Sequence, residues 1–146
     1  MDETEAFLGS VLPRLMEADT ALHNGDAAPR IAIWSHSDPV TLFGAALMAS
    51  GWTEMRQVFE SLASRFSNGT YEYEVIAAGA SGDLGYVVGI EHTTASVGGA
   101  TPEAYELRVT EVFRREDSEW KVVHRHADPM PGSDAASRQL ARLVET

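Results

Sequence analysis

A change of hydrophobic period near the middle of the chain constrains the fold more than any other feature. Up to Phe66, apolar residues recur at helical spacing, most regularly from Trp52 onward. From Tyr71 the pattern becomes strand-like. Helices that come first and an antiparallel sheet that follows define the α+β class. We therefore predict N-terminal helices packed against a curved, mainly antiparallel sheet, with a concave mouth of the kind that binds ligands.

The helical half of the sequence predicts three helices. Apolar spacing places the first over residues 4–22, with Pro13 either kinking it or marking a later start. Asp26 is suited to cap a short second helix. The third helix is expected to start near Ser50 and to end at Asn68-Gly69, a pair typical of helix ends.

Turn residues divide the second half into strands that run back and forth. The clearest turn is Glu116-Asp117-Ser118-Glu119, because runs rich in β-branched and aromatic residues flank it on both sides. The predicted strands span residues 40–43, 71–78, 84–94, 104–115 and 119–127. After them, residues 134–144 are expected to form a short terminal helix or a frayed tail.

Length and composition indicate one globular domain. A chain of 146 residues, 44% of them hydrophobic, is long enough to bury a sizeable core. We expect a single domain over 1–146, with its core at about 4–128 and a tail or short helix at 129–146. No apolar run approaches the roughly 18 residues of a membrane span.

The charge balance argues against several classes of partner. The chain has 22 acidic and 11 basic residues, a formal net charge of −11, and no cluster of Lys and Arg. Phosphate backbones and anionic membranes would repel it, so we expect neither nucleic acid nor membrane as a partner. The absence of cysteine excludes disulfides and thiolate zinc sites. The acidic N-terminus is unlike a secretory signal, and we expect a cytoplasmic protein.

Two stretches of the chain resemble a known family. They are Trp34 with Ser37-Asp-Pro-Val-Thr-Leu-Phe-Gly44, and Arg108-Val-Thr with Trp120-Lys-Val-Val-His-Arg-His126. Together with the element order over about 4–128, they resemble the SnoaL-like proteins of the nuclear transport factor 2-like (ketosteroid isomerase-like) superfamily. The resemblance implies a cone-shaped α+β barrel, a homodimer, and a pocket between the curved sheet and the helices. The superfamily contains both enzymes and binding modules, so the resemblance does not select a function.

The ketosteroid isomerase branch of this superfamily can be compared residue by residue. Its mechanism requires a carboxylate base on the strand after the second helix. Asp38-Pro39-Val40 superficially resembles that motif, but an alignment through Trp34 and Gly44 puts Phe43 at the position of the base. Asp38 then falls in the preceding turn, and we expect the isomerase chemistry to be absent.

The resemblance also suggests where a pocket lies. The association domain of calmodulin-dependent kinase carries pocket arginines that match Glu91, Glu111 and Ala127 of this chain. The charge is reversed at the two glutamates, and a cation stands nearby at Arg125. We predict that Glu91, Glu111 and Arg125 point inward and form a buried Arg–carboxylate pair. They would either orient a ligand, with a glutamate as general acid or base, or form a structural salt-bridge network.

The histidines of the last predicted strand support two interpretations. Regular alternation along 119–127 would place one set of side chains on a single face: Trp120, Val122, His124 and His126. With His92 and a carboxylate, His124 and His126 could bind zinc. We favour the interpretation that they pack at a dimer interface on the convex face, and we expect no metal site. His23 and His36 look like ordinary helix-end and loop residues.

The aromatic residues are mostly expected in the core. Trp34 and Trp52 are the best candidates for the pocket wall, because each lies at the end of a predicted element. Core packing alone would explain Phe43, Phe59 and Tyr73 equally well. No nucleotide-binding glycine motif, phosphate loop or nucleophile elbow occurs, so no cofactor is expected.

Two functions remain open from the sequence. The first is a small-molecule-binding pocket protein, able to act as a cofactor-independent acid–base enzyme of the isomerase, cyclase, dehydratase or hydrolase type. The second is a non-catalytic module for oligomerisation or ligand sensing. The predicted ligand-binding residues are Trp34, Trp52, Glu91, Glu111 and Arg125.

Overall fold

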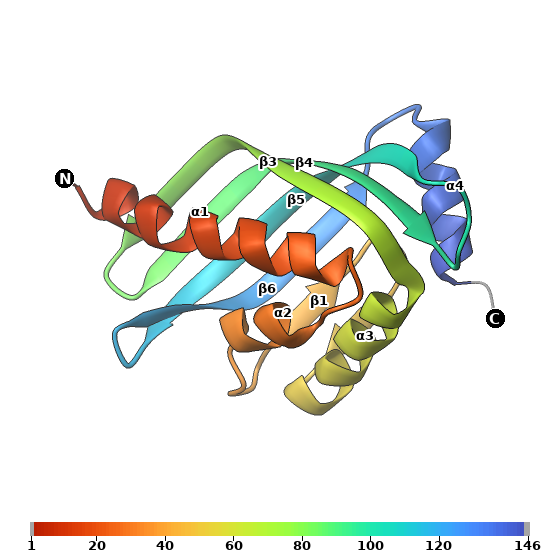
Figure 1. Cartoon of the computed structure of the whole chain (residues 1–146). Helices are drawn as coiled ribbons and strands as arrows, with labels where there is room; N and C mark the ends of the chain where they lie inside the picture. Colours follow the sequence, from red (N-terminus) through yellow and green to blue (C-terminus); the bar gives the residue numbers. More distant parts are fainter. Residues whose placement is uncertain (1, 145–146) are drawn as a thin grey trace.

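The structure, a computed structural model, describes residues 2–144 and shows a curved sheet with helices on its inner face (Figure 1). The elements run in the order α1 (Glu3–Leu22), α2 (Ala28–Ile33), β1 (Thr41–Phe43), β2 (Met48–Ser50), α3 (Trp52–Arg65), β3 (Phe66–Ser81), β4 (Leu84–Val97), β5 (Glu103–Glu116), β6 (Glu119–Pro129) and α4 (Asp134–Leu143). The predicted α+β class, with helices before a mainly antiparallel sheet, is confirmed.

The six strands form one open sheet in the order β2-β1-β6-β5-β4-β3. Every neighbouring pair is antiparallel except β1 and β6, which run parallel. β2 and β3 are the two edges and do not pair with each other, so the cone stays unclosed. α1, α2 and α3 lie on the concave side, and α4 packs at one end against β5 and β4 (Figure 1).

The helix α3 begins within the predicted stretch, but its predicted C-terminal end is wrong, and the short strand before it is not predicted. The strand Met48–Ser50 precedes the helix, which begins at Trp52 after Gly51. At its other end α3 stops at Arg65, and β3 begins at once with Phe66. Asn68-Gly69 forms an irregularity in β3 instead of a helix end, with Asn68 at φ 53°. The prediction failed because residues that tolerate positive φ suit both helix ends and strand bulges.

The first helix runs unbroken through Pro13, so a later start is excluded. Its buried face, which includes Phe7, Val11 and Leu15, packs on the sheet and compensates for the hydrogen bond that proline cannot donate. Asp26 accepts a hydrogen bond from the Ala28 amide, 3.0 Å away, at the start of α2. At the other end of the chain, the terminal helix is confirmed as α4.

A bulge in β6 changes which side chains face inward. Val112 of β5 pairs with His124, but the next residue, Phe113, pairs with Val122, so Val123 is the extra residue. As a result Trp120 and Val122 share the inner face with Arg125 and Ala127. The predicted grouping of Trp120 and Val122 with His124 and His126 is therefore wrong, because it assumed a regular strand.

The narrow end of the cone is closed by aromatic packing. The Phe7 ring meets the rings of Phe113 and Trp120 edge-on, at centroid distances of 5.2 and 4.8 Å. Gly85 makes room for this contact, because a Cβ there would come within 2.8 Å of the Phe7 ring. The wide end has no such plug, and polar side chains gather there.

Gly89 of β4 should be intolerant of any side chain. A Cβ at Gly89 would lie 2.3 Å from the Glu74 carbonyl oxygen and 2.5 Å from the Tyr73 ring. We expect Gly89→Ala to lower the free energy of unfolding by about 1–3 kcal/mol. Urea unfolding followed by circular dichroism measures this change.

Gly9→Ala is the matched control. Gly9 lies in α1, and a Cβ there would meet nothing within 4 Å. Because alanine favours helix, this variant should be as stable as the wild type or more so. Equal stability of the two variants would show that the sheet adjusts freely at Gly89.

Candidate functional site

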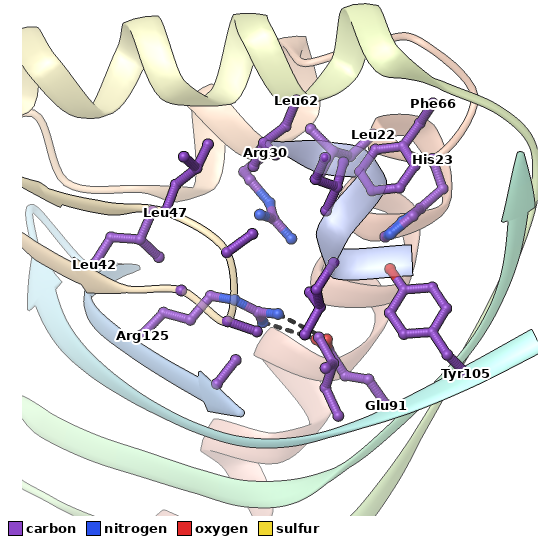
Figure 2. A pocket seen from close by; sticks show the side chains of 17 residues that line it. Leu22, His23, Arg30, Leu42, Leu47, Leu62, Phe66, Glu91, Tyr105 and Arg125 are labelled. Atoms are coloured by element: carbon purple, nitrogen blue, oxygen red, sulfur yellow. Dashed lines mark hydrogen bonds and ion pairs between the residues drawn. The ribbon is translucent and has the colours of Figure 1, made fainter. Parts of the chain in front are cut away.

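A cavity of about 60 Å³ lies at the wide end of the cone, between the sheet, the ends of α1 and α3, and α4 (Figure 2). That space holds roughly five water molecules. Its apolar walls come from five elements and include Leu22, Leu42, Leu62, Phe66, Leu140 and Leu143. The segment from Gly44 to Leu47 closes it between β1 and β2.

A buried ion pair forms one polar wall of the cavity. The Arg125 guanidinium donates two hydrogen bonds to the Glu91 carboxylate, from Nη1 to Oε2 at 2.8 Å and from Nη2 to Oε1 at 2.7 Å. Tyr71 donates a third, 2.6 Å long, to Glu91 Oε2. Figure 2 shows this pair at the base of the cavity. The predicted buried Arg–carboxylate pair therefore forms.

The ion pair fixes the charge of both partners. Burial alone would raise the pKa of Glu91, but the charge of Arg125 and the hydrogen bonds from Arg125 and Tyr71 lower this pKa to about 2. Burial would lower the pKa of Arg125, but Glu91 outweighs it and raises this pKa. Both groups are charged at neutral pH, and each neutralises the other.

Glu111 is also buried on the inner side of the sheet, next to Arg125, but it is not among the residues that line the cavity, and it has no such partner. The exposed fraction of its side chain is 3%, and its Oε1 lies 3.9 Å from Arg125 Nη1, too far for a hydrogen bond. Within residues 2–144, Glu111 Oε1 and the Tyr73 hydroxyl are the two buried polar atoms without a hydrogen-bond partner. Burial raises the pKa of Glu111, the nearby charge of Arg125 opposes this, and that of Glu91 adds to it.

A second buried ion pair lies on the helical side of the cavity. Arg30 of α2 contacts Asp19 of α1, and both residues are buried. Burial lowers the pKa of Arg30 to about 10, so the guanidinium stays charged at neutral pH. Figure 2 shows Arg30 pointing into the cavity from the side opposite Glu91. Both cations that line the cavity thus have an acidic partner.

Two further polar residues line the cavity, and sequence reasoning missed both. His23 follows α1, and Tyr105 belongs to β5. His23 was interpreted as an ordinary helix-end residue, and nothing local in the sequence distinguishes it from one. Tyr105 and Glu111 lie an even number of residues apart on β5, so their side chains share the inner face. This alternation is the feature of the sequence that points to Tyr105.

Trp34 and Trp52 lie away from the cavity lining. Trp34 is in the core, with its ring 5.3 Å from that of Phe59, and a backbone bridge joins it to Val122 of β6. Trp52 stacks on His36 near the start of α3, at a centroid distance of 3.9 Å. Asp38 also lies outside the cavity lining, and its Oδ1 accepts a hydrogen bond from the Trp52 amide.

The histidines of β6 lie on the outer face of the sheet. Phe43 meets both His124 and His126 edge-on, and Thr41 Oγ1 hydrogen-bonds to His124 Nδ1 at 2.7 Å. His92 instead contacts Glu74 and Glu106. Among the described residues, no group of three or more histidine and acidic side chains is arranged to hold a metal ion.

The outer wall of the cavity is held to the sheet by polar contacts of α4. The buried amide of Gln139 donates to the carbonyl oxygens of Ala95 and Glu103, at 2.9 and 3.2 Å. Arg138 and Arg142 both pair with the Glu103 carboxylate. These contacts place Leu140 and Leu143 over the cavity.

None of the helices in the described part of the chain has the length and apolar character needed to span a membrane.

Comparison with solved structures shows the same fold in proteins of low sequence identity. A protein from Streptomyces avermitilis, provisionally named a dehydratase of the nuclear transport factor 2-like family, matches with a TM-score of 0.72 and 20% identity, over 86% of this chain and 97% of that one. A protein from Novosphingobium aromaticivorans, provisionally named a scytalone dehydratase, gives a TM-score of 0.75 at 11% identity, over 90% and 92%.

A third solved structure with this fold is named after an association domain instead of a dehydratase. It is provisionally named a calcium/calmodulin-dependent protein kinase II association domain, from Xanthomonas campestris, and matches with a TM-score of 0.67 and 13% identity, over 88% of each chain. At these identities the structures share the fold, and none of them assigns an activity to this chain. None of the curated proteins matches its sequence.

The model of one family covers most of the chain. The SnoaL-like domain matches residues 14–131, which include β1 to β6 and most of the helical layer. The curved sheet with helices on its concave side is the arrangement that the sequence resemblance implied. This chain belongs to the SnoaL-like domain family.

Proposed function

We propose that this protein binds a small molecule in the cavity at the wide end of its cone, as a cofactor-independent protein of acid–base type. The observation that carries the proposal is the composition of the cavity. Its walls are apolar, except where the buried Glu91–Arg125 ion pair forms a polar wall whose two charges neutralise each other. Cavities of this composition, with few and fixed polar groups, are typical ligand sites. The reaction types that fit are isomerisation, cyclisation, dehydration and hydrolysis, each of which acid–base catalysis can promote without a cofactor, with water released in dehydration and consumed in hydrolysis.

Glu111 is the residue that supports acid–base chemistry. Its carboxyl is buried, lacks a full hydrogen-bond complement and has a pKa raised by burial, so it holds its proton to a higher pH than an exposed glutamate does. Glu91 is unsuited to this role, because two hydrogen bonds from Arg125 hold it as a carboxylate. We assign Glu91 and Arg125 to orienting the ligand, and Glu111 to the proton.

The second candidate function is a non-catalytic module for oligomerisation or ligand sensing. The Glu91–Arg125 pair favours it, because a complete ion pair also serves as a purely structural wall. The outer sheet face favours it too, because several of its apolar side chains are exposed: Phe43, Met48, Ile76, Leu84 and Tyr86. Exposed apolar patches of this kind mark interaction sites. We propose that two copies of the chain associate through this face.

The Glu111→Gln variant should separate the proton-holding role from a structural one. An unfolded glutamate loses its proton near pH 4.5, but burial delays this loss in the folded chain. The contribution of Glu111 to stability is thus fully present at low pH and decreases as the pH rises through its raised pKa. We expect the stability of Glu111→Gln relative to the wild type, measured by urea unfolding, to increase as the pH rises above about 4.5.

Glu72→Gln, on an exposed position of β3, serves as the control for this series. Its stability relative to the wild type is measured over the same pH range. If Glu111→Gln behaves like this control, Glu111 titrates in the folded protein as it does in the unfolded chain. The proton-holding role would then be excluded.

Ligand screening tests the cavity directly. A compound that binds only the folded state at a hundred times its Kd stabilises it by about 2.7 kcal/mol, or about 5–10 °C in Tm for a domain of this size. The panel contains steroids, polyketide-like aromatics, small carboxylic acids and small neutral aromatics. A hit should lose its effect in Ala127→Val, which fills the cavity, and keep it in Ala104→Val on the exposed side of β5. A panel with no hit would favour the non-catalytic module.

Self-association through the outer face can be measured by light scattering. We expect a mass of about twice the 15.8 kDa of the chain at high micromolar concentration. Ile76→Glu places a charge on the exposed face and should give the monomeric mass. Met16→Glu, on the exposed side of α1, should leave the dimer intact. A monomeric wild type would contradict the proposed association.

A further inference from the structure

The hydrogen bond between His23 and the backbone fixes which ring nitrogen can serve a ligand. His23 Nδ1 lies 2.6 Å from the Asp19 carbonyl oxygen, at the last turn of α1. A carbonyl oxygen can only accept, so Nδ1 carries the proton and donates it. In a neutral imidazole the other nitrogen, Nε2, then presents a lone pair. His23 lines the cavity, and no residue in the described range 2–144 hydrogen-bonds to Nε2.

The surrounding sequence holds this ring in place. Asn24 exchanges two hydrogen bonds with the backbone of Gly69, one to its carbonyl oxygen and one from its amide, each 3.0 Å long. Gly69 must lack a side chain, because a Cβ there would come within 2.4 Å of the His23 Cβ. The irregularity of β3 at Asn68-Gly69 therefore provides the space against which His23 packs.

The ring is also kept neutral. It lies between Phe66 and Tyr71, at centroid distances of 4.3 and 6.1 Å, and the residue is only 6% exposed. Burial lowers the pKa of His23 to about 4, with the charge of Glu91 opposing this and that of Arg125 adding to it. At neutral pH the imidazole is an uncharged acceptor.

Tyr105 supplies the complementary group. Its side chain lines the cavity from β5, and Figure 2 shows its hydroxyl pointing toward the side where His23 lies. None of the described residues hydrogen-bonds to this hydroxyl. Burial, with the nearby charge of Glu91 adding to it, raises the pKa of Tyr105, so the hydroxyl keeps its proton. The cavity thus contains one acceptor and one donor, and neither has a hydrogen-bond partner among residues 2–144.

We propose that His23 Nε2 and the Tyr105 hydroxyl recognise the hydroxyl group of a neutral alcohol or phenol. The ligand hydroxyl donates its proton to Nε2, and its oxygen accepts the hydrogen bond of Tyr105. This inference rests on the proposed ligand-binding cavity and names the class of ligand that it takes.

The charges of the cavity select against other ligand classes. A carboxylate has no proton to donate and would face the lone pair of Nε2. Both cations of the lining, Arg30 and Arg125, already have acidic partners, so no unpaired positive charge attracts an anion. The apolar walls, among them Leu22, Leu62 and Leu140, fit a hydrocarbon body attached to one hydroxyl.

The test compares matched probes in the full chain. Phenol, anisole, benzene and benzoate are titrated by calorimetry into the wild type, Tyr105→Phe, His23→Phe and, as a control, the exposed Tyr86→Phe. We expect phenol to bind the wild type about tenfold more tightly than anisole or benzene, the effect of one to two net hydrogen bonds. Tyr105→Phe should weaken phenol binding several-fold without affecting benzene, and Tyr86→Phe should bind all four probes as the wild type does.

The remaining outcomes separate this inference from the proposed function. If phenol, anisole and benzene bind the wild type equally, the cavity binds ligands and the hydroxyl recognition is refuted. If no probe binds at millimolar concentration, the hydroxyl recognition is refuted, and the wider ligand panel decides the proposed function separately. A preference for phenol that persists in Tyr105→Phe and His23→Phe would refute the assignment of these two residues. Nitrogen NMR of His23 in the wild type, where phenol but not benzene should shift Nε2, keeps the test decisive if His23→Phe does not fold.

Discussion

The pairing of Arg125 with Glu91 is the interaction on which the interior of this protein depends. An isolated charge buried among apolar walls would cost many kcal/mol, and only a partner with good geometry makes it tolerable. Two parallel hydrogen bonds from one guanidinium supply that geometry. The pair joins β4 to β6 across the intervening strand β5. A polar interior is possible here because its charges cancel.

This cancellation explains why neighbouring acidic residues behave differently. Arg125 is committed to Glu91, and Arg30 is committed to Asp19, so Glu111 has no cation of its own. One carboxylate is held ionised while another, on the adjacent strand, favours its protonated form. Acid–base sites commonly contain two carboxyl groups whose pKa values are pushed apart by their environments in this way. The same arrangement would also serve as a rigid wall, and ligand binding distinguishes the two.

The sequence was informative wherever a regular period decided the structure. Helices before an antiparallel sheet and the hairpin at Glu116–Glu119 follow from spacing, and both are found. Spacing places Glu91 and Glu111 only on one face of their strands; their inward direction, which the family resemblance implied, is found as well. The errors occur where the period is interrupted. The extra residue Val123 reverses the alternation of β6, and a bulge at Asn68 resembles a helix end. His23 and Tyr105 reach the cavity through contacts between distant segments, which no local pattern encodes.

The open edge of β3 has a consequence for how copies of this chain can meet. A long edge strand offers a row of free backbone N–H and C=O groups on which another chain could extend the sheet and begin to aggregate. Two irregularities, near Asn68 and Ile76, interrupt this row, and α1 packs along the same strand. Growth of the sheet by added strands is therefore disfavoured at this edge. A second copy that docked on the proposed outer face would meet side chains instead of free backbone groups.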